Sequence, residues 1–341
     1  MTSMPKCRQV RLARHPEAMI QPSDLVIGET QLPSPGPTDV VVRNRWFRIS
    51  ISTRLMADRD AQAVEGIPFP ALSPGDTLAD GAIGEVLACP ADSGFAVGDF
   101  VSHPFGWRDH AVVPVEQCVA LGRGPIEPAA YLGHGWTAYA ALTRGIQIRP
   151  GDTVFVSSAA GAIGSMAGQV ARRLGAARVI GSTGSRDKAD WMRADLGYDA
   201  AVLRNGGPLA DQLAAAAPDG IDVFVDMVGG DHLVAAVGAA REGARFVLLG
   251  ALTAELDRQG ASIVAPAALD SFQLILKDIT LRGYSADRDI AAFAEWIAWQ
   301  RDAGLHFART MVAGLDAAPQ ALHDACEGRL RGVVIVALKQ G

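Results

Sequence analysis

The residues whose spacing is most informative follow a short apolar run in the segment TVFVSSAAGAIG, at positions 153–164. Small residues recur there as Ala159-x-Gly161-x-x-Gly164, and an amphipathic segment, AIGSMAGQVARRLGA, runs on from the same loop. Small side chains let the backbone approach a pyrophosphate, and unpaired N–H groups at the start of a helix favour its negative charge. The sequence therefore predicts a dinucleotide site that includes Ala160, Gly161, Ile163 and Gly164. A tight strand-to-helix turn that binds nothing has the same motif, but the strand before it, the helix after it and the next strand favour dinucleotide binding.

The end of the next strand-like run, RVIGSTG, indicates which dinucleotide is bound. An NAD site usually has an acidic residue at this place to hold the ribose 2′-OH, whereas this chain has Gly181-Ser182-Thr183-Gly184-Ser185. Arg186 and Lys188 follow, and hydroxyls with two cations suit an additional 2′-phosphate. The alternative is that these cations are solvated charges in the first turn of a helix, where they would oppose its dipole. We predict NADPH or NADP as the cofactor, with 2′-phosphate contacts from Ser182, Thr183, Arg186 and Lys188.

The elements that must position these residues alternate between strands and helices after Pro125. Strand-like runs such as IDVFVDMVGG and ARFVLLGAL enclose a helix-like run, DHLVAAVGAAR, and Gly197 is suited to end the helix formed by RDKADWMRADL. Alternation at this spacing predicts βαβ units and a parallel sheet.

Before about residue 120, short β-branched runs such as DVVVRNRWFRIS, GAIGEVLAC and HAVVPV are separated by turn residues, which indicates a small barrel or sandwich.

Composition limits the class of protein. A chain of 341 residues suggests two domains, and 49% hydrophobic with 20% charged residues is ordinary for a packed globular protein. The net charge of −6 argues against nucleic acid or an anionic membrane as a partner. The start of the chain lacks the apolar region of a signal peptide, and no apolar run approaches the roughly 18 residues of a membrane helix. Four widely spaced cysteines make a disulfide framework improbable, so we predict a cytoplasmic protein.

The same residues, in this order, resemble the medium-chain dehydrogenase/reductase superfamily, and within it the zinc-free branch of leukotriene hydroxydehydrogenase/prostaglandin reductase and 2-alkenal reductases. Matching pieces run along nearly the whole chain and include LPSPGPTDVVVRN, GWRDHAVV, WTAYAAL, AAGAIGS and GLDAAPQALHDACEGRLRGVVIVAL. The resemblance implies an α/β fold with a GroES-like partial β-barrel at 1–122, rejoined by 308–341, and a Rossmann doubly wound parallel-sheet domain at 123–307. It also implies a substrate cleft at their junction and a homodimer formed through the edge of the Rossmann sheet.

Position by position, the resemblance implies further cofactor contacts. Lys188 falls on the family's 2′-phosphate lysine, and Arg204 stands where a tyrosine contacts the same phosphate, a replacement that still suits an anion. The family's Asn-Val-Gly-Gly stretch is Met227-Val228-Gly229-Gly230 in this chain. Val228 is assigned to the cofactor site, and Thr137, Gly250 and Ala251 are assigned to its nicotinamide end.

The substrate side departs from the family. The common Asp-Pro-Tyr-Met-Arg stretch is Ser50-Ile51-Ser52-Thr53-Arg54, which keeps only the arginine, and a second family tyrosine is Glu255. Arg54 either clamps a carboxylate or phosphate of the substrate or pairs with an acid at the surface. The predicted substrate pocket consists of Trp46, Arg54 and Tyr131.

A hydride-transfer enzyme without a metal needs hydrogen-bond donors for the oxyanion that develops on its substrate. The candidates are Tyr284, His134 and Ser52, although Tyr284 and His134 also suit purely structural roles. Asp226, at the end of a strand, is interpreted as structural. No metal is expected, because the family's Gly-His-Glu stretch is replaced by Asp80-Gly81-Ala82-Ile83-Gly84-Glu85, without the histidine that a tetrahedral zinc site would use.

The sequence therefore predicts an NADPH-dependent, zinc-independent oxidoreductase that reduces an activated C=C bond by hydride transfer. Its partner would be a small electrophilic molecule such as an enone or enal. One alternative is a quinone reductase, or a biosynthetic-pathway reductase with a polar substrate, of the same superfamily. The other is a catalytically silent NADPH-binding protein.

Overall fold

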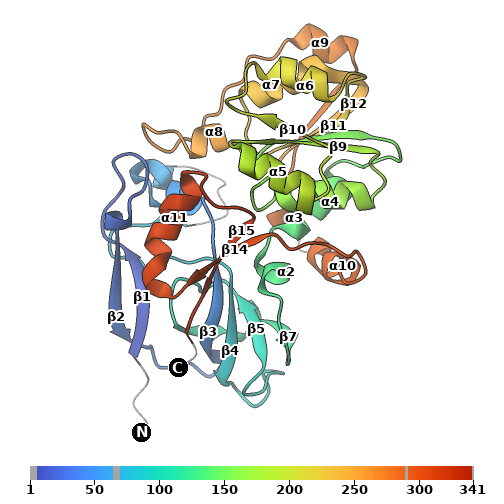
Figure 1. Ribbon diagram of the computed structural model, residues 1–341. Helices are drawn as coiled ribbons and strands as arrows, with labels where there is room; N and C mark the ends of the chain where they lie inside the picture. Colours follow the sequence, from blue (N-terminus) through green and yellow to red (C-terminus); the bar gives the residue numbers. More distant parts are fainter. Residues whose placement is uncertain (1–5, 64–69, 289–290, 340–341) are drawn as a thin grey trace. The chain divides into compact units, whose positions relative to one another are not determined.

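The computed structural model describes residues 6–63, 70–288 and 291–339. The chain divides into two compact units (Figure 1). The first unit comprises Met1–Gly133, Arg258–Ala261 and Arg309–Gly341, and the second comprises His134–Asp257 and Ser262–Ala308. In the part of the chain that the structure describes, no helix is both long enough and apolar enough to cross a bilayer.

The first unit is built mainly of antiparallel strands. Its seven-stranded sheet has the order β14-β15-β3-β4-β5-β7, with β6 paired to β3, and β1 and β2 form a separate two-stranded sheet. The strands are β1 (Lys6–Leu12), β2 (Leu25–Gln31), β3 (Asp39–Ile49), β4 (Ala82–Ala88), β5 (Phe100–His103), β6 (His110–Pro114), β7 (Val119–Gly122), β14 (Arg309–Ala313) and β15 (Val333–Ala337). The helices are α1 (Thr53–Ala57), α2 (Pro128–Leu132) and α11 (Ala318–Cys326).

The C-terminal segment completes this sheet. β15 pairs antiparallel with β3, so the last strand of the chain lies beside one of the first. Apolar side chains that alternate along the strands form the core of the unit, as a half-buried strand requires. This cluster consists of Val40, Val42, Val86, Val101, Ala111 and Val113.

The boundary between the units follows Gly133, whereas the sequence analysis placed it after residue 122. Helix α2 accounts for the difference, because it contacts β3, β4 and β15 of the first unit. Two polar contacts add to this packing: Arg48 Nη1 donates to the Leu132 carbonyl at 3.3 Å, and Arg309 pairs with Glu127 at 2.9 Å.

A buried histidine in β5 makes the stability of the protein depend on pH. His103 is 4% exposed, and burial together with the positive charge of Arg108 lowers the pKa of its imidazole to about 3. The unfolded chain binds a proton near pH 6.5, so acid favours the unfolded state across the interval down to pH 3. We expect the free energy of unfolding to fall by about 2 kcal/mol between pH 7.5 and pH 5 from this group alone.

Urea denaturation at the two pH values measures this effect. His103→Gln is expected to unfold more easily at pH 7.5 but to show a flatter pH dependence, because its side chain does not titrate. A variant that keeps the full slope of the native protein would contradict the assignment.

The second unit contains a six-stranded parallel sheet with the order β10-β9-β8-β11-β12-β13. The strands are β8 (Thr153–Val156), β9 (Arg178–Thr183), β10 (Ala200–Leu203), β11 (Ile221–Asp226), β12 (Ala240–Leu248) and β13 (Thr280–Gly283). The main helices are α3 (Gly135–Ala140), α4 (Gly164–Arg173), α5 (Arg186–Asp195), α6 (Leu209–Ala216), α7 (Asp231–Ala239), α8 (Leu252–Glu255), α9 (Ser271–Leu276) and α10 (Ala291–Trp299). The predicted alternation of strands and helices and the predicted parallel sheet are confirmed.

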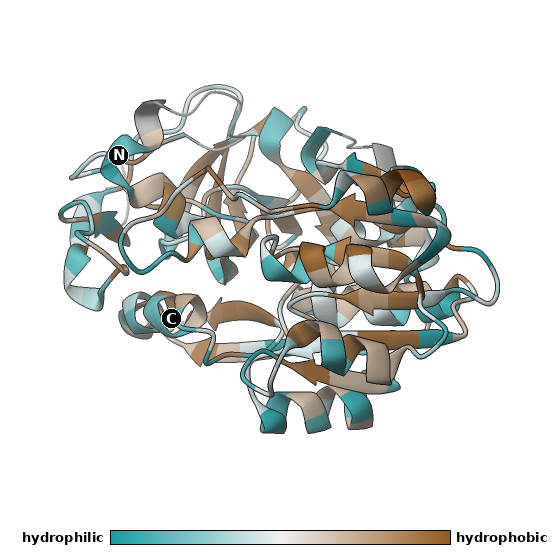
Figure 2. Cartoon of the chain, turned by 90° about the horizontal axis from the view of Figure 1, so that it is seen from above, coloured by the Kyte–Doolittle hydropathy of each residue, from teal (hydrophilic) through white to brown (hydrophobic). Residues whose placement is uncertain are grey.

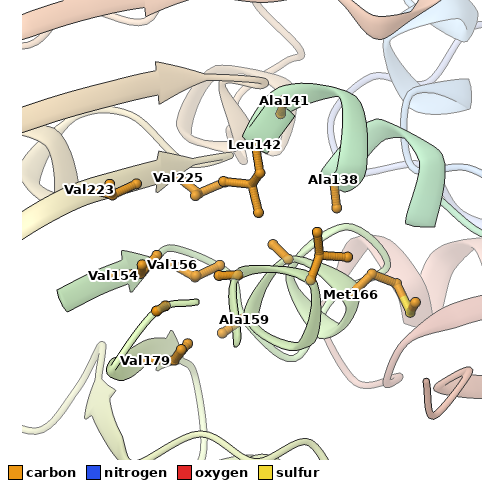
Figure 3. Packing of buried hydrophobic residues seen from close by; sticks show 14 of the residues in the cluster. Ala138, Ala141, Leu142, Val154, Val156, Ala159, Met166, Val179, Val223 and Val225 are labelled. Atoms are coloured by element: carbon orange, nitrogen blue, oxygen red, sulfur yellow. The ribbon is translucent and has the colours of Figure 1, made fainter. Parts of the chain in front are cut away.

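Helices cover both faces of this sheet, as a buried parallel sheet requires. In Figure 1, α4 and α5 lie on one face and α6 and α7 on the other. Val154 and Val156 of β8 point into a core with Leu142 and Met166 (Figure 3), whereas Phe155 joins the core on the opposite face. Figure 2 shows the strands mostly in the hydrophobic colour, with hydrophilic residues on outer turns and helix faces.

The end of α5 follows the sequence prediction. The helix stops at Asp195, and Gly197 follows with a φ of 70°, a left-handed conformation that glycine adopts without strain.

Candidate functional site

The order of strands in the second unit places a switch in topology between β8 and β11. From β8 the chain proceeds outward through β9 and β10, and it then returns to β11 on the other side of β8. In open parallel sheets, ligands bind at the carboxyl ends of the strands where this reversal occurs. The loops that follow β8 and β11 are therefore the first candidates for a ligand site.

The loop after β8 contains the predicted phosphate-binding residues, and its glycines are required by packing. A Cβ on Gly164 would lie 2.4 Å from the carbonyl oxygen of Ser158 and 2.6 Å from Cα of Ala159, both backbone atoms. None of the described residues accepts a hydrogen bond from the backbone N–H of Ile163 or Gly164. Ala160 and Gly161 lie in the same loop, so the structure presents small residues and free N–H groups at the start of α4, as a pyrophosphate requires.

The end of β9 supports this loop. The backbone N–H of Ser158 donates to Ser182 Oγ at 3.2 Å, and the N–H of Ala159 donates to the Ser182 carbonyl at 2.8 Å. The side chain of Ser182 is therefore buried under the loop, and its role as a 2′-phosphate contact remains a proposal. Thr183 is also buried, and its carbonyl accepts the N–H of Arg204 at 3.0 Å.

Three cationic residues follow the ends of β9 and β10. Ser185 caps α5 by accepting the N–H of Lys188 at 3.4 Å, which places Arg186 and Lys188 in the first turn of the helix. Arg204 follows β10, the neighbouring strand, and its Nη2 lies 3.1 Å from the position of a Cβ on Gly184. The structure thus brings the side chain of Arg204 beside Gly184 at the end of β9.

The loops after β11 and β12 contact each other. The N–H of Leu252 donates to the Met227 carbonyl at 3.0 Å, and both the N–H and Oγ1 of Thr253 donate to the Val228 carbonyl, at 3.1 and 2.9 Å. A Cβ on Gly250 would lie 3.2 Å from the Met227 carbonyl oxygen. Val228, predicted to bind the cofactor, therefore lies at the carboxyl edge of the sheet together with Gly250 and Ala251, which were predicted to bind its nicotinamide end.

Tyr284 follows β13 at the same edge. Its N–H donates to the Leu248 carbonyl at 3.0 Å, and Cγ of its ring lies 3.2 Å from the position of a Cβ on Gly145. The ring packs in a cluster with Trp136 and Ala140 of α3. Thr137 belongs to that helix and His134 precedes its first residue, so Tyr284 lies beside the helix that carries both.

The remaining predicted site residues belong to the first unit. Trp46 in β3 packs against Phe100, with ring centroids 6.0 Å apart, while Ser52 precedes α1 and Tyr131 lies in α2, both half-buried. Arg54 is only 1% exposed. Its side chain therefore does not lie at the surface, where one of the two alternatives placed it.

A tyrosine that the sequence analysis did not single out fixes the start of α4. Tyr198 is buried, and its hydroxyl donates to the Gly164 carbonyl at 2.7 Å. Burial raises the pKa of Tyr198, so the hydroxyl keeps its proton. A Cβ on Gly168 would lie 2.4 Å from the ring, and one on Gly181 would lie 2.8 Å from it. A glycine inside a helix was the available sequence signal, since such a residue often marks close packing.

Tyr198→Phe is expected to lower the free energy of unfolding by about 1 kcal/mol, because a buried carbonyl loses one hydrogen-bond donor. Denaturant unfolding measures the change, and Tyr139→Phe is the matched control, since no described residue is hydrogen-bonded to the Tyr139 hydroxyl. Equal midpoints for Tyr198→Phe and the native protein would show that the bond contributes nothing.

Two family models match the chain. Residues 8–121 match the family described as "N-terminal domain of oxidoreductase", and residues 162–300 match "Zinc-binding dehydrogenase". The chain belongs to the medium-chain dehydrogenase/reductase superfamily. The predicted superfamily and the predicted two-domain α/β fold are confirmed.

Individual medium-chain relatives cover nearly the whole chain. The NADPH-dependent curcumin reductase of Escherichia coli is 26% identical over 95% of each chain, and the NADP(+)-dependent 2-alkenal reductase of Nicotiana tabacum is 29% identical over 88% of each. The crystal structure of CurA from Vibrio vulnificus in complex with NADPH has a TM-score of 0.84 and 27% identity, covering 98% of this chain and 100% of that one. These relatives lie in the predicted branch of the superfamily.

The description of one matched family mentions zinc, a metal that proteins hold with grouped cysteine, histidine or carboxylate side chains. Among the residues that the structure describes, no group of three histidine, cysteine, aspartate or glutamate side chains is arranged to hold a metal ion. A tetrahedral zinc site needs grouped nitrogen or sulfur ligands, and the described residues do not present such a group.

Proposed function

We propose that this protein is an NADPH-dependent oxidoreductase that reduces an activated C=C bond of a small electrophilic molecule. The observation that carries the proposal is the loop at Ser158–Gly164, in which only glycine fits at residue 164, followed at the end of β9 by cations instead of an acid. Relatives named as curcumin and 2-alkenal reductases, each described as dependent on NADPH or NADP, support both the cofactor and the reaction.

The residues of the second unit fit the two ends of this cofactor. Amides at the start of α4 would bind the pyrophosphate, and Arg186, Lys188 and Arg204 would bind the 2′-phosphate through charge-assisted hydrogen bonds. The nicotinamide end would be held by Thr137, Val228, Gly250 and Ala251. When bound, NADPH supplies the hydride.

Reduction of an enone or enal requires two things of the protein. Negative charge develops on the carbonyl oxygen when the β-carbon accepts a hydride, so a hydrogen-bond donor must face that oxygen. A proton must then reach the α-carbon. We propose Tyr284, His134 and Ser52 as candidates for these roles, and Trp46, Arg54 and Tyr131 as contacts of the substrate.

The proposal is tested by following NADPH absorbance while a 2-alkenal, an enone or a quinone is added, with the products identified by mass spectrometry. A saturated aldehyde or ketone formed in equal amount to the NADPH consumed is the expected result. Faster reduction of quinones would favour the quinone-reductase alternative. Tight NADPH binding without turnover of any electrophile would favour a silent binding protein.

We also propose that two copies associate through β13. Among the described residues, β13 pairs only with β12, so its other edge carries unpaired backbone groups that a second copy can satisfy. Helix α9 precedes this strand and exposes Phe272, Ile275 and Leu276, which are 65%, 73% and 61% exposed.

Light scattering is expected to give the mass of a dimer, and Ile275→Glu is expected to give a monomer that stays folded. A native protein that is monomeric at micromolar concentration would contradict this.

We place the protein in the cytoplasm. All four cysteines, Cys7, Cys89, Cys118 and Cys326, are free thiols, which is typical of a reducing compartment. Fractionation of the source cells tests this placement. The net charge of −6 gives no support to nucleic acid as a partner.

A further inference from the structure

Two polar side chains are buried together at the topological switch of the parallel sheet. Ser157 follows β8 and Asp226 ends β11, the adjacent strand, and they are 0% and 1% exposed. Because Val156 pairs with Val225, the two residues are next to each other in register, and Ser157 Oγ donates to Asp226 Oδ1 at 2.7 Å. A carboxylate buried this deeply is stable only when several donors face it.

Those donors come from the loop after β11. Asp226 Oδ1 accepts the N–H groups of Val228 at 2.8 Å and Gly229 at 3.1 Å, and Ser157 Oγ accepts the N–H of Met227 at 2.8 Å. The pair thereby binds three successive backbone N–H groups. Gly229 has a φ of 77°, a turn that these bonds hold in place.

The same loop anchors the loop after β12. The carbonyl of Asp226 accepts the N–H of Leu249 at 2.7 Å, and the carbonyls of Met227 and Val228 accept donors from Leu252 and Thr253. A shift of the Asp226 carboxylate would therefore move both loops that carry Val228, Gly250 and Ala251. At the ends of β9 and β10, Ser182 and the Thr183 carbonyl bond instead to Ser158, Ala159 and the N–H of Arg204.

We propose that Asp226 and Ser157 are positioning residues for the nicotinamide half of the cofactor, an inference that rests on the proposed function. The buried pair sets the geometry of the two loops at the carboxyl edge of the sheet, and it does not hold the adenosine half. Neither side chain needs to contact the reacting atoms, because both act through the backbone of residues 227–229.

A matched control lies at the opposite end of the same strand. Asp222 of β11 accepts the N–H of Thr153 through Oδ2 at 2.8 Å and pairs with Arg241 at 3.1 Å. Asp222→Asn makes the same chemical change as Asp226→Asn in the same strand and at the edge of the sheet away from the switch. Any change in affinity or kcat in Asp222→Asn therefore measures how the loss of a carboxylate from β11 acts through the stability of the fold alone.

The experiment compares the affinity of each full-length variant for NADPH and for 2′,5′-ADP, which has the adenosine and the 2′-phosphate but no nicotinamide. Asp226→Asn is expected to weaken NADPH binding and to lower kcat with a 2-alkenal by about 10- to 100-fold, since small displacements of reacting groups have effects of this size. Its affinity for 2′,5′-ADP should stay within about twofold of the native value, as should both affinities of Asp222→Asn.

If Asp226→Asn does not fold, Ser157→Ala gives a second measurement. The Ser157→Ala variant keeps the carboxylate of Asp226 and removes one of the hydrogen bonds that this carboxylate accepts. It should lower kcat in the same direction and leave 2′,5′-ADP binding unchanged. Equal losses for NADPH and 2′,5′-ADP, or no loss of kcat in a folded variant, would overturn the positioning role. A native protein that binds neither ligand would overturn the proposed function itself.

Discussion

Gly164→Ala is expected to weaken NADPH binding by at least about 100-fold, close to 2.7 kcal/mol of binding free energy. The added methyl group would meet the Ser158 carbonyl oxygen at 2.4 Å and Cα of Ala159 at 2.6 Å. Backbone atoms cannot rotate aside as a flexible side chain can, so the loop must move away from α4. The N–H groups of Ile163 and Gly164 would then no longer point toward one phosphate. Titration of NADPH fluorescence measures the loss.

The control is Gly238→Ala in α7, where no heavy atom lies within 4 Å of the new methyl group. Alanine favours a helix over glycine by about 1 kcal/mol, so this variant should be as stable as the native protein or more stable, with unchanged affinity. If Gly164→Ala bound NADPH as tightly as Gly238→Ala does, the loop would not be the pyrophosphate site.

Lys188→Ala is expected to lower kcat/KM for NADPH by about 10- to 100-fold, which is the size of a lost charge-assisted hydrogen bond. The same change should leave kcat/KM for NADH nearly unchanged, because NADH has no 2′-phosphate. Arg204→Ala should shift the preference in the same direction, since its guanidinium lies next to Gly184 at the end of β9. Steady-state kinetics with both cofactors give the ratio directly.

Arg193→Ala is the matched control, because Arg193 lies in the last turn of the same helix, away from the Ser185 cap. It removes one positive charge from α5 and should affect both cofactors equally and weakly. An equal loss for NADPH and NADH in Lys188→Ala would remove the 2′-phosphate assignment.

Most strands and helices with strong periodicity were predicted where the structure has them, including α4, α5, α7 and β11. Four strands were not predicted: β2, β7, β10 and β14. β10 and β14 have only four and five residues, and β2 contains Gly28 and several polar residues, so each has a weak pattern by itself. They are strands because a neighbouring strand pairs with them, which is a tertiary effect.

The sequence by itself determined the features that depend on neighbours in the chain. The loop between a strand and a helix, the glycines at 161 and 164, and the cations that follow Thr183 in place of an acid lie within one short stretch, so local rules are enough to predict the cofactor class.

Only the tertiary structure decided the features that depend on distant residues. Ser157 bonds to Asp226 across 69 positions of the chain, and Tyr198 bonds to Gly164 across 34. No periodicity encodes these contacts, because each forms only when the parallel sheet brings separate strand ends and helices together. The burial of Arg54 and of the Ser182 hydroxyl has the same origin, since a side chain's exposure depends on what packs over it and not on its own residue type.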